Sequence, residues 1–288
     1  MRRLLVTGAS GYLGAFLSAA VAPGWDVTGT FLTQSSRPSA VALRQLDLRD
    51  GQAVRRLLAE LRPAAVIHTA CSNRDQANLD AILPAARHLA AACHELGLRL
   101  VHVSTDLVFD GEHAPYTDES PPSPIMPYGQ AKAEAEAAVA SLCPEAAIVR
   151  PSLIWALDPL DRQTGWLVDG LRRGTPVTLF TDEIRCPVYL PDLATALLEL
   201  AALPHLAGAL NLGGPQALNR WDFGLRLLAA LGLPRAQSIQ PGTVAASGLT
   251  RARNLTLECR RASQSLATRL HAVDEVLAGA RRSPKLEG

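Results

Sequence analysis

The sequence lacks an excess of charge of either sign. Its 28 basic and 27 acidic residues nearly cancel and leave a formal net charge of +1. A protein that binds nucleic acid or another polyanion usually carries a clustered basic excess. The near balance therefore gives no reason to expect a nucleic-acid partner.

Cysteine is scarce, and the five cysteines are widely spaced. Their number is odd and no two form a C-x-x-C pair, which argues against a disulfide framework or a zinc cage. The seven histidines likewise show no metal-ligand spacing, so we predict no metal site. We expect the cysteines to be small buried hydrophobic side chains in a protein of the reducing cytoplasm.

No apolar run approaches the roughly 18 residues that a membrane span needs. Near the start, Gly8, Gly11 and Gly14 interrupt the apolar stretch, which excludes a signal-peptide core. Hydrophobic residues make up 48% of the chain and charged residues only 19%, which excludes global disorder. We therefore predict a soluble cytoplasmic protein with no membrane partner, long enough for one large domain or two closely associated ones.

Short apolar runs alternate with amphipathic segments through residues 1–150. The runs are nearly continuous in Val, Leu and Ile, which is typical of strands that helices cover on both faces. This alternation predicts an α/β fold, a doubly wound parallel (Rossmann) sheet. The expected strands are 3–7, 25–31, one ending at Leu46, 65–69, 99–104 and 146–149, and the expected helices are 12–21, 51–61, 77–96 and 128–142.

The spacing becomes irregular after Arg150, with proline and glycine between shorter elements. We interpret residues 1–150 as a dinucleotide-binding domain. Residues 151–288 are then mainly a smaller, interleaved C-terminal substrate lobe, from which some segments return to the first domain. The expected strands of this half are 187–190 and 209–212, and its expected helices are 191–202, 219–231 and 262–280.

A glycine-rich turn separates the first expected strand from the first helix. Glycine lets the backbone turn tightly and lets a pyrophosphate approach, while the helix N-terminus supplies N–H donors. The spacing G-x-x-G-x-x-G differs from G-x-G-x-x-G, but the strand–turn–helix context is the one that dinucleotide binding requires. We therefore predict a cofactor site at Gly8, Ser10, Gly11, Tyr12, Leu13 and Gly14.

The end of the second strand bears on which dinucleotide binds. A carboxylate there would bond the ribose hydroxyls and select NAD, but the strand ends at Thr30 and Phe31. The next segment offers hydroxyls and Arg37 for a 2′-phosphate, so we favour NADP(H) over NAD(H). An ordinary solvated charge is the competing interpretation of Arg37. Asp47 and Leu48, after the third strand, are placed to meet the adenine edge.

Tyr128 and Lys132 are four residues apart in an expected helix, so they share one face with Cβ atoms about 5–6 Å apart. A phenol ordinarily has a pKa of about 10, and a fixed ammonium favours its ionised form. Lowering that pKa by about three units requires about 4 kcal/mol. We expect Tyr128 to exchange a proton with a carbonyl or alcohol oxygen.

Ser104, Thr105 and Asp106 follow the fifth expected strand, at the edge where doubly wound sheets bind ligands. A hydroxyl there can hold a substrate oxygen beside the phenol. Asp106 either bonds the substrate or caps a turn. After the fourth strand, Thr69 and Ala70 are expected to line the nicotinamide ribose. The glycine turn, these hydroxyls and the Tyr–Lys pair together predict hydride-transfer chemistry.

Longer segments extend this pattern across nearly the whole chain. They are Val103–Gly111 (VSTDLVFDG), Pro115–Tyr116 with Glu119, Pro127–Lys132 with Glu136, Arg150–Ser152, Pro187 with Asp192–Ala194, and Trp221 with Phe223. They resemble the extended short-chain dehydrogenase/reductase superfamily, and more closely the dTDP-4-dehydrorhamnose reductase family. The S-T-D-x-V-F-D-G segment is the most specific part of this resemblance.

The resemblance implies that Thr105, Tyr128 and Lys132 form a catalytic triad and that NADPH is the cofactor. The implied reaction reduces the 4-keto group of a nucleotide-linked 6-deoxysugar. Ser104 and Pro151 would join Tyr128 and Lys132 at the cofactor, and a homodimer is plausible because related enzymes often pair. The residues assigned to the substrate side are Asp106, Leu107, Phe109, Leu153 and Arg251.

The substrate half departs from the family pattern. Leu107 replaces the usual Tyr, Leu153 stands where Trp is common, and Ile82 aligns near an Asn of many relatives. In the C-terminal R-P-x-N-S motif, Leu255 replaces the serine. Three interpretations therefore stay open: a reductase of a nucleotide-activated 4-keto sugar, a related reductase or epimerase with another carbonyl substrate, and an NADP-binding regulatory subunit similar to that of methionine adenosyltransferase.

Overall fold

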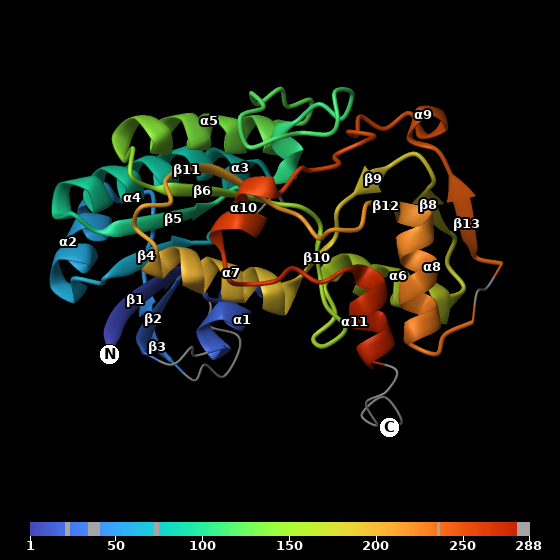
Figure 1. Ribbon diagram of the computed structural model, residues 1–288, viewed down its shortest axis with the longest axis horizontal. Helices are drawn as coiled ribbons and strands as arrows, with labels where there is room; N and C mark the ends of the chain where they lie inside the picture. The colour runs from blue at the N-terminus through green and yellow to red at the C-terminus, as the bar shows by residue number, and fades with distance from the viewer. Residues whose placement is uncertain (21–23, 34–40, 72–74, 235–236, 281–288) are drawn as a thin grey trace.

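The computed structural model describes residues 1–20, 24–33, 41–71, 75–234 and 237–280. At its centre is a seven-stranded parallel sheet in the order β11-β6-β5-β4-β1-β2-β3 (Figure 1). This confirms the predicted doubly wound α/β fold. The strands are β1 (Arg2–Thr7), β2 (Trp25–Phe31), β3 (Ala42–Gln45), β4 (Ala65–His68), β5 (Arg99–Val103), β6 (Ala147–Pro151) and β11 (Gly208–Leu212).

Side-chain alternation along the strands builds a separate core on each face of the sheet. Leu4 and Val6 pack in one core while Leu5, between them, packs in the other. Figure 1 shows α1 (Tyr12–Ala19) and α7 (Leu190–Ala202) covering one face, and α2, α4 and α5 covering the other. The bounds of these last three are Gly51–Leu61, Ile82–Leu96 and Pro127–Leu142.

The prediction of one continuous helix over 77–96 is wrong. The structure has a short α3 (Gln76–Asp80), then Ala81, and then α4. Pro84 explains the break, because proline has no N–H to bond the carbonyl four residues earlier and is tolerated only in a first helical turn. Asp75 caps α3 by accepting from the N–H of Asn78 at 2.9 Å.

The helix predicted over 262–280 is also interrupted, into α10 (Arg260–Ser265) and α11 (Val273–Ala280). The carboxylate of Glu199, on α7, accepts from the N–H groups of Ala267 at 2.6 Å and Thr268 at 2.9 Å. Those donors are therefore withdrawn from any helical ladder. Tertiary hydrogen bonds override local helix propensity at this point.

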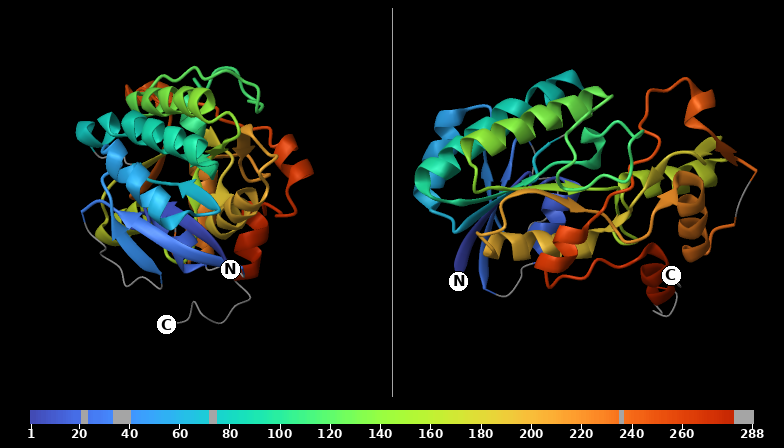
Figure 2. Two further views of the ribbon diagram at one scale, coloured as in Figure 1. Left: turned by 90° about the vertical axis from the view of Figure 1, so that its left-hand side faces the viewer. Right: turned by 45° about the horizontal axis from the view of Figure 1, so that its top comes forward.

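Residues after β6 build a second group of elements beside the sheet, seen on the right of Figure 1 and again in Figure 2. Three two-stranded sheets pair β7 with β10, β9 with β12, and β8 with β13. Trp155 is 1% exposed and packs against Tyr189 and Phe223, so it fills the core of this second group. The elements are β7 (Ile154–Trp155), α6 (Arg162–Arg173), β8 (Val177–Phe180), β9 (Ile184–Arg185), β10 (Val188–Tyr189), β12 (Leu218–Asn219), α8 (Arg220–Ala230), β13 (Ile239–Gly242) and α9 (Val244–Ser247).

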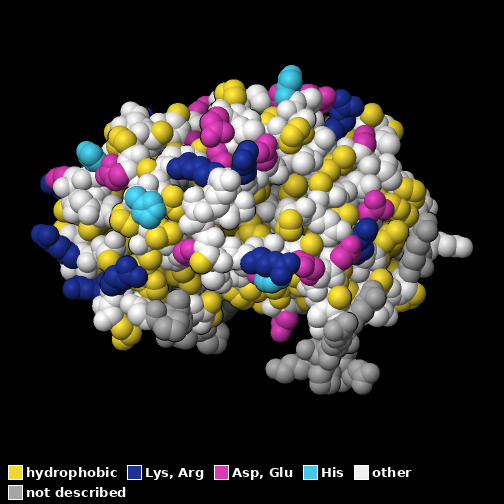
Figure 3. All heavy atoms as spheres, in the orientation of Figure 1, with side chains coloured by type: hydrophobic (Ala, Val, Ile, Leu, Met, Phe, Trp, Pro, Cys, Tyr) yellow, Lys and Arg dark blue, Asp and Glu magenta, His cyan; other side chains and the backbone are white. Residues whose placement is uncertain are grey.

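The surface agrees with the near balance of charge. On the face shown in Figure 3, basic and acidic side chains are interspersed rather than separated by sign. Within the described ranges, no helix combines the length and the apolar character that crossing a membrane requires.

Candidate active site

The sheet order brings the predicted site residues to one edge. Strands β1, β4, β5 and β6 are neighbours and parallel, so their carboxyl ends lie side by side. The glycine turn follows β1, Thr69 follows β4, and Ser104 follows β5. The short 3-10 helix η1 (Asp106–Val108) comes next, and Tyr128 lies in the first turn of α5, which packs against η1. The topology therefore unites segments that the sequence separates by more than 100 residues.

The turn after β1 has the shape of a phosphate cradle. A Cβ at Gly14 would lie far inside contact distance of the Gly8 carbonyl oxygen and 2.8 Å from Thr69 Oγ1. Gly11 precedes α1 without a side-chain cap, which leaves the first N–H groups of the helix to a ligand. Ser10 is exposed, whereas Leu13 is buried in the core, so only the backbone of Leu13 can face a phosphate. The residues present fit a dinucleotide.

We expect Gly14→Ala to weaken dinucleotide binding strongly. Its methyl group would collide with backbone atoms of Gly8, which cannot rotate away as a side chain could. The first turn of α1 must then shift and the cradle opens, so we expect NADPH affinity to fall at least about 100-fold, by isothermal titration calorimetry. The matched control is Gly279→Ala in α11, where an added Cβ meets nothing. That variant should bind normally and gain about 0.5–1 kcal/mol of stability. Unchanged NADPH affinity in Gly14→Ala would contradict the cradle.

The residues predicted at the adenosine end are only partly placed. Arg37 lies outside the described residues. The Asp47 carboxylate binds the Arg49 guanidinium at 2.7 Å, and this pairing lowers the pKa of Asp47. The Leu48 carbonyl lies 3.0 Å from His88 Nδ1. A role for Asp47 and Leu48 at the adenine stays a prediction.

In the Tyr–Lys pair, Tyr128 is half-buried and Lys132 is buried. Lys132 is 1% exposed, and its Nζ donates to the Val103 carbonyl at 2.7 Å. Burial lowers the pKa of Lys132. Burial also raises the pKa of Tyr128 well above its usual value, and Cys71 and Asp106 raise it further. The expectation that the ammonium stabilises a phenolate is therefore wrong for this arrangement, because desolvation dominates and the ammonium is bound to a carbonyl.

A cysteine that we expected to be buried lies next to the Tyr128 phenol. Cys71 is exposed, and its sulfur is 3.5 Å from the Tyr128 hydroxyl. Cys259 is half-buried, and Cys93, Cys143 and Cys186 are buried. All five thiols are free. Strand β4 ends at His68, and the chain then leaves the core at the carboxyl edge of the sheet. Cys71, three residues later, is therefore accessible.

Helix α5 packs directly on η1. A Cβ at Gly129 would overlap the Leu107 carbonyl, so glycine is required next to Tyr128. The Thr105 hydroxyl accepts from the Leu107 N–H at 3.2 Å and donates to Asp106 at 3.4 Å. Ser104 Oγ is buried without a hydrogen-bond partner among the described residues. The two hydroxyls after β5 and the phenol in the first turn of α5 thus lie at the same edge of the sheet.

Two residues predicted on the substrate side are closed off. Phe109 is 0% exposed, stacked on Tyr116 with ring centroids 4.2 Å apart, and lies beneath the Arg150 guanidinium. Asp106 is also 0% exposed, because Arg185 and Ser152 bond its carboxylate. Their side chains are structural in this arrangement, which corrects the prediction. Leu107 and Leu153 are half-buried.

Arg251, also predicted on the substrate side, lines a pocket of about 260 Å³ in the second group of elements. It donates to Glu183 through Nε at 2.8 Å and Nη2 at 3.0 Å. Buried Arg220 Nη1 has no hydrogen-bond partner among the described residues, and burial lowers the pKa of Arg220 to about 10. The pocket, named the cationic pocket below, is lined by Arg162, Gln163, Trp166, Thr178, Leu179, Phe180, Glu183, Arg220 and Arg251.

Trp166 is 48% exposed at the rim of the cationic pocket and does not belong to a core. On α5 the acidic side chain of Glu134 is exposed, but that of Glu136 is not. Glu136 is buried and bonded by Arg150 at 2.8 Å. A charged Arg150 inside an otherwise apolar strand is the signal that could have revealed this pair, since a buried charge requires a partner.

Comparison with known proteins decides the family. The model of the RmlD substrate binding domain matches residues 1–281. The chain belongs to this family. The predicted membership of the extended short-chain dehydrogenase/reductases, dTDP-4-dehydrorhamnose reductase-like, is confirmed.

Two relatives illustrate the range of the RmlD family. Methionine adenosyltransferase 2 subunit beta of Bos taurus is 28% identical over 90% of this chain and 81% of its own length. The probable low-salt glycan biosynthesis reductase Agl14 of Haloferax volcanii is 31% identical over 79% of each chain.

Two solved structures share the fold. The dTDP-4-dehydrorhamnose reductase of Bacillus anthracis in complex with NADP has a TM-score of 0.83 at 22% identity, covering 96% of this chain and 98% of its own. The dTDP-glucose 4,6-dehydratase of the same organism in complex with NAD has a TM-score of 0.81 at 16% identity, covering 98% and 96%. The protein is thus an RmlD-type member of the extended short-chain reductases, built on their dinucleotide-binding fold.

Proposed function

We propose that this protein is an NADP(H)-dependent reductase that transfers hydride to the 4-keto group of a nucleotide-activated 6-deoxysugar. The observation that carries the proposal is the assembly of Thr105, Tyr128 and Lys132 beside the glycine turn at one sheet edge. The dinucleotide supplies the hydride when bound. The remaining chemistry is the work of this chain's side chains.

Proton delivery falls to Tyr128. Reduction of a ketone needs a proton at the carbonyl oxygen, and burial keeps the phenol protonated at neutral pH by raising its pKa. Thr105, at the end of β5, supplies a second hydroxyl to orient that oxygen. Lys132 lies one helical turn after Tyr128, and its Nζ is held by the Val103 carbonyl. It places a positive charge near the phenol oxygen, where negative charge develops as the proton leaves. The arrangement suits the direction of reduction.

The cationic pocket supports a nucleotide diphosphate as the handle of the substrate. Guanidinium groups bind phosphate oxygens through paired N–H donors, and the unpartnered Nη1 of Arg220 is available for such a bond. Trp166 and Phe180 offer aromatic faces for a base or sugar. Leu107 and Leu153 leave the sugar end less polar than in the family pattern.

The choice of NADP(H) rests on what β2 lacks. The strand ends at Phe31 without a carboxylate that would bond the ribose hydroxyls of NAD. Arg37 would neutralise the 2′-phosphate. We expect Arg37→Ala to raise the KM for NADPH about tenfold while leaving that for NADH within twofold. Equal effects on the two cofactors would contradict this choice.

The test of the function is turnover. Purified protein is mixed with NADPH and dTDP-4-dehydrorhamnose, and the loss of reduced-nicotinamide absorbance is followed. Consumption of NADPH with formation of the reduced sugar supports the proposal. The protein could instead bind NADPH tightly and reduce another ketone from a panel but not this sugar. That result would contradict the proposed substrate and put the other ketone in its place.

A second candidate is a regulatory subunit, which the methionine adenosyltransferase relatives favour. Ile82, buried at the start of α4, also offers no polar side chain where many relatives place Asn. This candidate predicts NADPH binding without turnover of any ketone, together with a stable complex with a larger enzyme. Size-exclusion chromatography with a methionine adenosyltransferase catalytic subunit distinguishes the two.

A further inference from the structure

The Asp106 carboxylate has no role in the proposed chemistry, but it lies next to the Thr105 hydroxyl, which does. It is 0% exposed. Arg185 clamps it with two guanidinium donors, Nε to Oδ2 at 2.8 Å and Nη2 to Oδ1. Ser152 donates to Oδ2 at 2.7 Å. Thr105 makes the weakest contact, 3.4 Å to Oδ1. The other donors thus satisfy Asp106 largely without Thr105.

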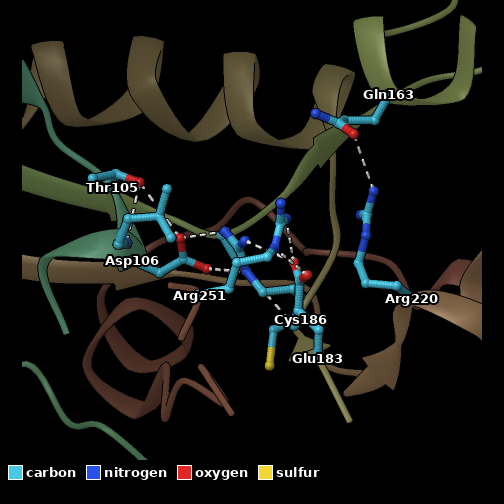
Figure 4. Close-up of polar contacts among 10 residues, drawn as sticks. Thr105, Asp106, Gln163, Glu183, Cys186, Arg220 and Arg251 are labelled. Atoms are coloured by element: carbon cyan, nitrogen blue, oxygen red, sulfur yellow. Dashed lines mark hydrogen bonds and ion pairs between the residues drawn. The ribbon is translucent and has the colours of Figure 1, made fainter. Parts of the chain in front are cut away.

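The clamp continues toward the cationic pocket as a chain of alternating charge. Arg185 Nη1 lies 3.9 Å from the carboxylate of Glu183. Glu183, 3% exposed, is itself held by Arg251. Figure 4 shows Thr105 and Asp106 at one end of this group, Glu183 and Arg251 in the middle, and Arg220 with Gln163 at the other. Arg251 donates to both carboxylate oxygens of Glu183, while Arg185 directs its Nε and Nη2 donors to Asp106.

The state of Asp106 decides what Thr105 can do. A hydroxyl has one proton, and it donates that proton either to Asp106 or to a substrate oxygen. A buried carboxylate without a cation partner is strongly disfavoured and captures any donor within reach. The Asp106 charge also acts on Tyr128, which it disfavours as phenolate. A cation on Asp106 therefore affects both groups that would face the carbonyl.

We propose that Arg185 is a positioning residue: by saturating Asp106 it leaves the Thr105 hydroxyl free to donate to the substrate carbonyl. This rests on the proposed function for its kinetic consequence, but not for its structural one. Arg185 does not touch the substrate in this role. It acts through Asp106, and the Glu183–Arg251 pair keeps it in place.

The structural consequence is tested without substrate, by a double-mutant cycle on unfolding. In the wild type, Thr105→Val should change the unfolding equilibrium constant less than about fivefold, because Asp106 scarcely needs that hydroxyl. In the Arg185→Lys background, the same change should cost more than about twentyfold, because one ammonium cannot bridge both oxygens and Thr105 fills the gap. Additivity within about twofold would overturn the proposal.

The kinetic consequence is tested with NADPH and the keto sugar. Arg185→Lys should lower kcat at least about tenfold while the KM for sugar and the Kd for NADPH stay within about twofold. In the Thr105→Val background, Arg185→Lys should have little further effect on kcat, whereas a merely structural role would lower it by the same factor again. An unchanged kcat, or effects that multiply, would overturn the proposal.

The matched control is Arg99→Lys. Arg99 is also a buried arginine and lies at the opposite end of β5, where it donates to the carbonyls of Leu200, Glu145 and Leu206. It should lose stability but keep kcat. If the wild type itself fails to reduce the sugar, the proposed function fails, and the unfolding cycle still decides the role of Arg185.

Discussion

Tyr128→Phe is expected to lower kcat by about 10²–10⁴-fold, the usual contribution of a positioned general acid. The substitution removes one oxygen from a half-buried side chain and leaves the ring, so packing against α4 and the sheet is retained. NADPH affinity should change little, because the glycine turn supplies the phosphate contacts. Stopped-flow mixing of preformed NADPH complex with the keto sugar measures the chemical step directly.

The same substitution elsewhere provides the control. Tyr189 is half-buried and packs on Trp155 with ring centroids 5.3 Å apart, so Tyr189→Phe removes a comparable oxygen from the other group of elements. It should retain kcat within about twofold. A Tyr128→Phe variant that binds NADPH normally and keeps more than a tenth of the wild-type kcat would remove Tyr128 from the role of general acid.

The sheet was predictable because its strands are locally distinctive. Runs such as Leu-Leu-Val and Ala-Val-Ile are apolar on both faces, and each is punctuated by glycine, proline or an Asp cap. The predicted helices are wrong where a side chain far away in the sequence determines the local structure. Nothing in residues 262–280 indicates that Glu199 takes the N–H groups of Ala267 and Thr268. The break near Pro84 was, by contrast, visible in the sequence.

The candidate site was predictable where each residue sits at the end of an element. The glycine turn, Thr105 and the Tyr128–Lys132 pair all follow that rule, and the sheet order brings them to one edge. Their partners were not predictable in the same way. Cys71 at Tyr128 and Arg185 on Asp106 pair residues 57 and 79 positions apart, and local spacing carries no signal at that range.

The predicted ionisation of the Tyr128 phenol was also wrong, again because distant parts of the chain determine it. From spacing alone, an ammonium four residues from a phenol should stabilise its ionised form. The structure instead gives Lys132 a carbonyl partner and buries it, with Tyr128 half-buried beside it, so desolvation raises the pKa of Tyr128 and lowers that of Lys132. The size of a desolvation effect depends on everything packed around a group, which no local pattern contains.

Arg150→Met is expected to cause the largest loss of stability, about 3–5 kcal/mol, because it leaves Glu136 as a buried carboxylate without its cation. Both side chains of the pair are 5% exposed. Arg150 also donates to the carbonyls of Asp118 and Ser120, so it fastens the loop that carries these two residues to β6. Urea unfolding followed by tryptophan fluorescence gives the free energy, and we expect the Tm to fall by about 10 °C.

Two further variants separate the cost of leaving a buried carboxylate unpaired from the cost of replacing an arginine by methionine. Arg226→Met breaks a partly exposed pair with Asp274, at 3.0 Å, and should cost less than about 1 kcal/mol. Adding Glu136→Met to Arg150→Met removes the orphaned carboxylate and should recover more than half of the loss, since apolar side chains of similar length often replace a buried pair well. If the double variant is no more stable than Arg150→Met alone, the loss comes from the bonds to Asp118 and Ser120. The pair with Glu136 would then hold α5, and with it Tyr128 and Lys132, less firmly than its burial implies.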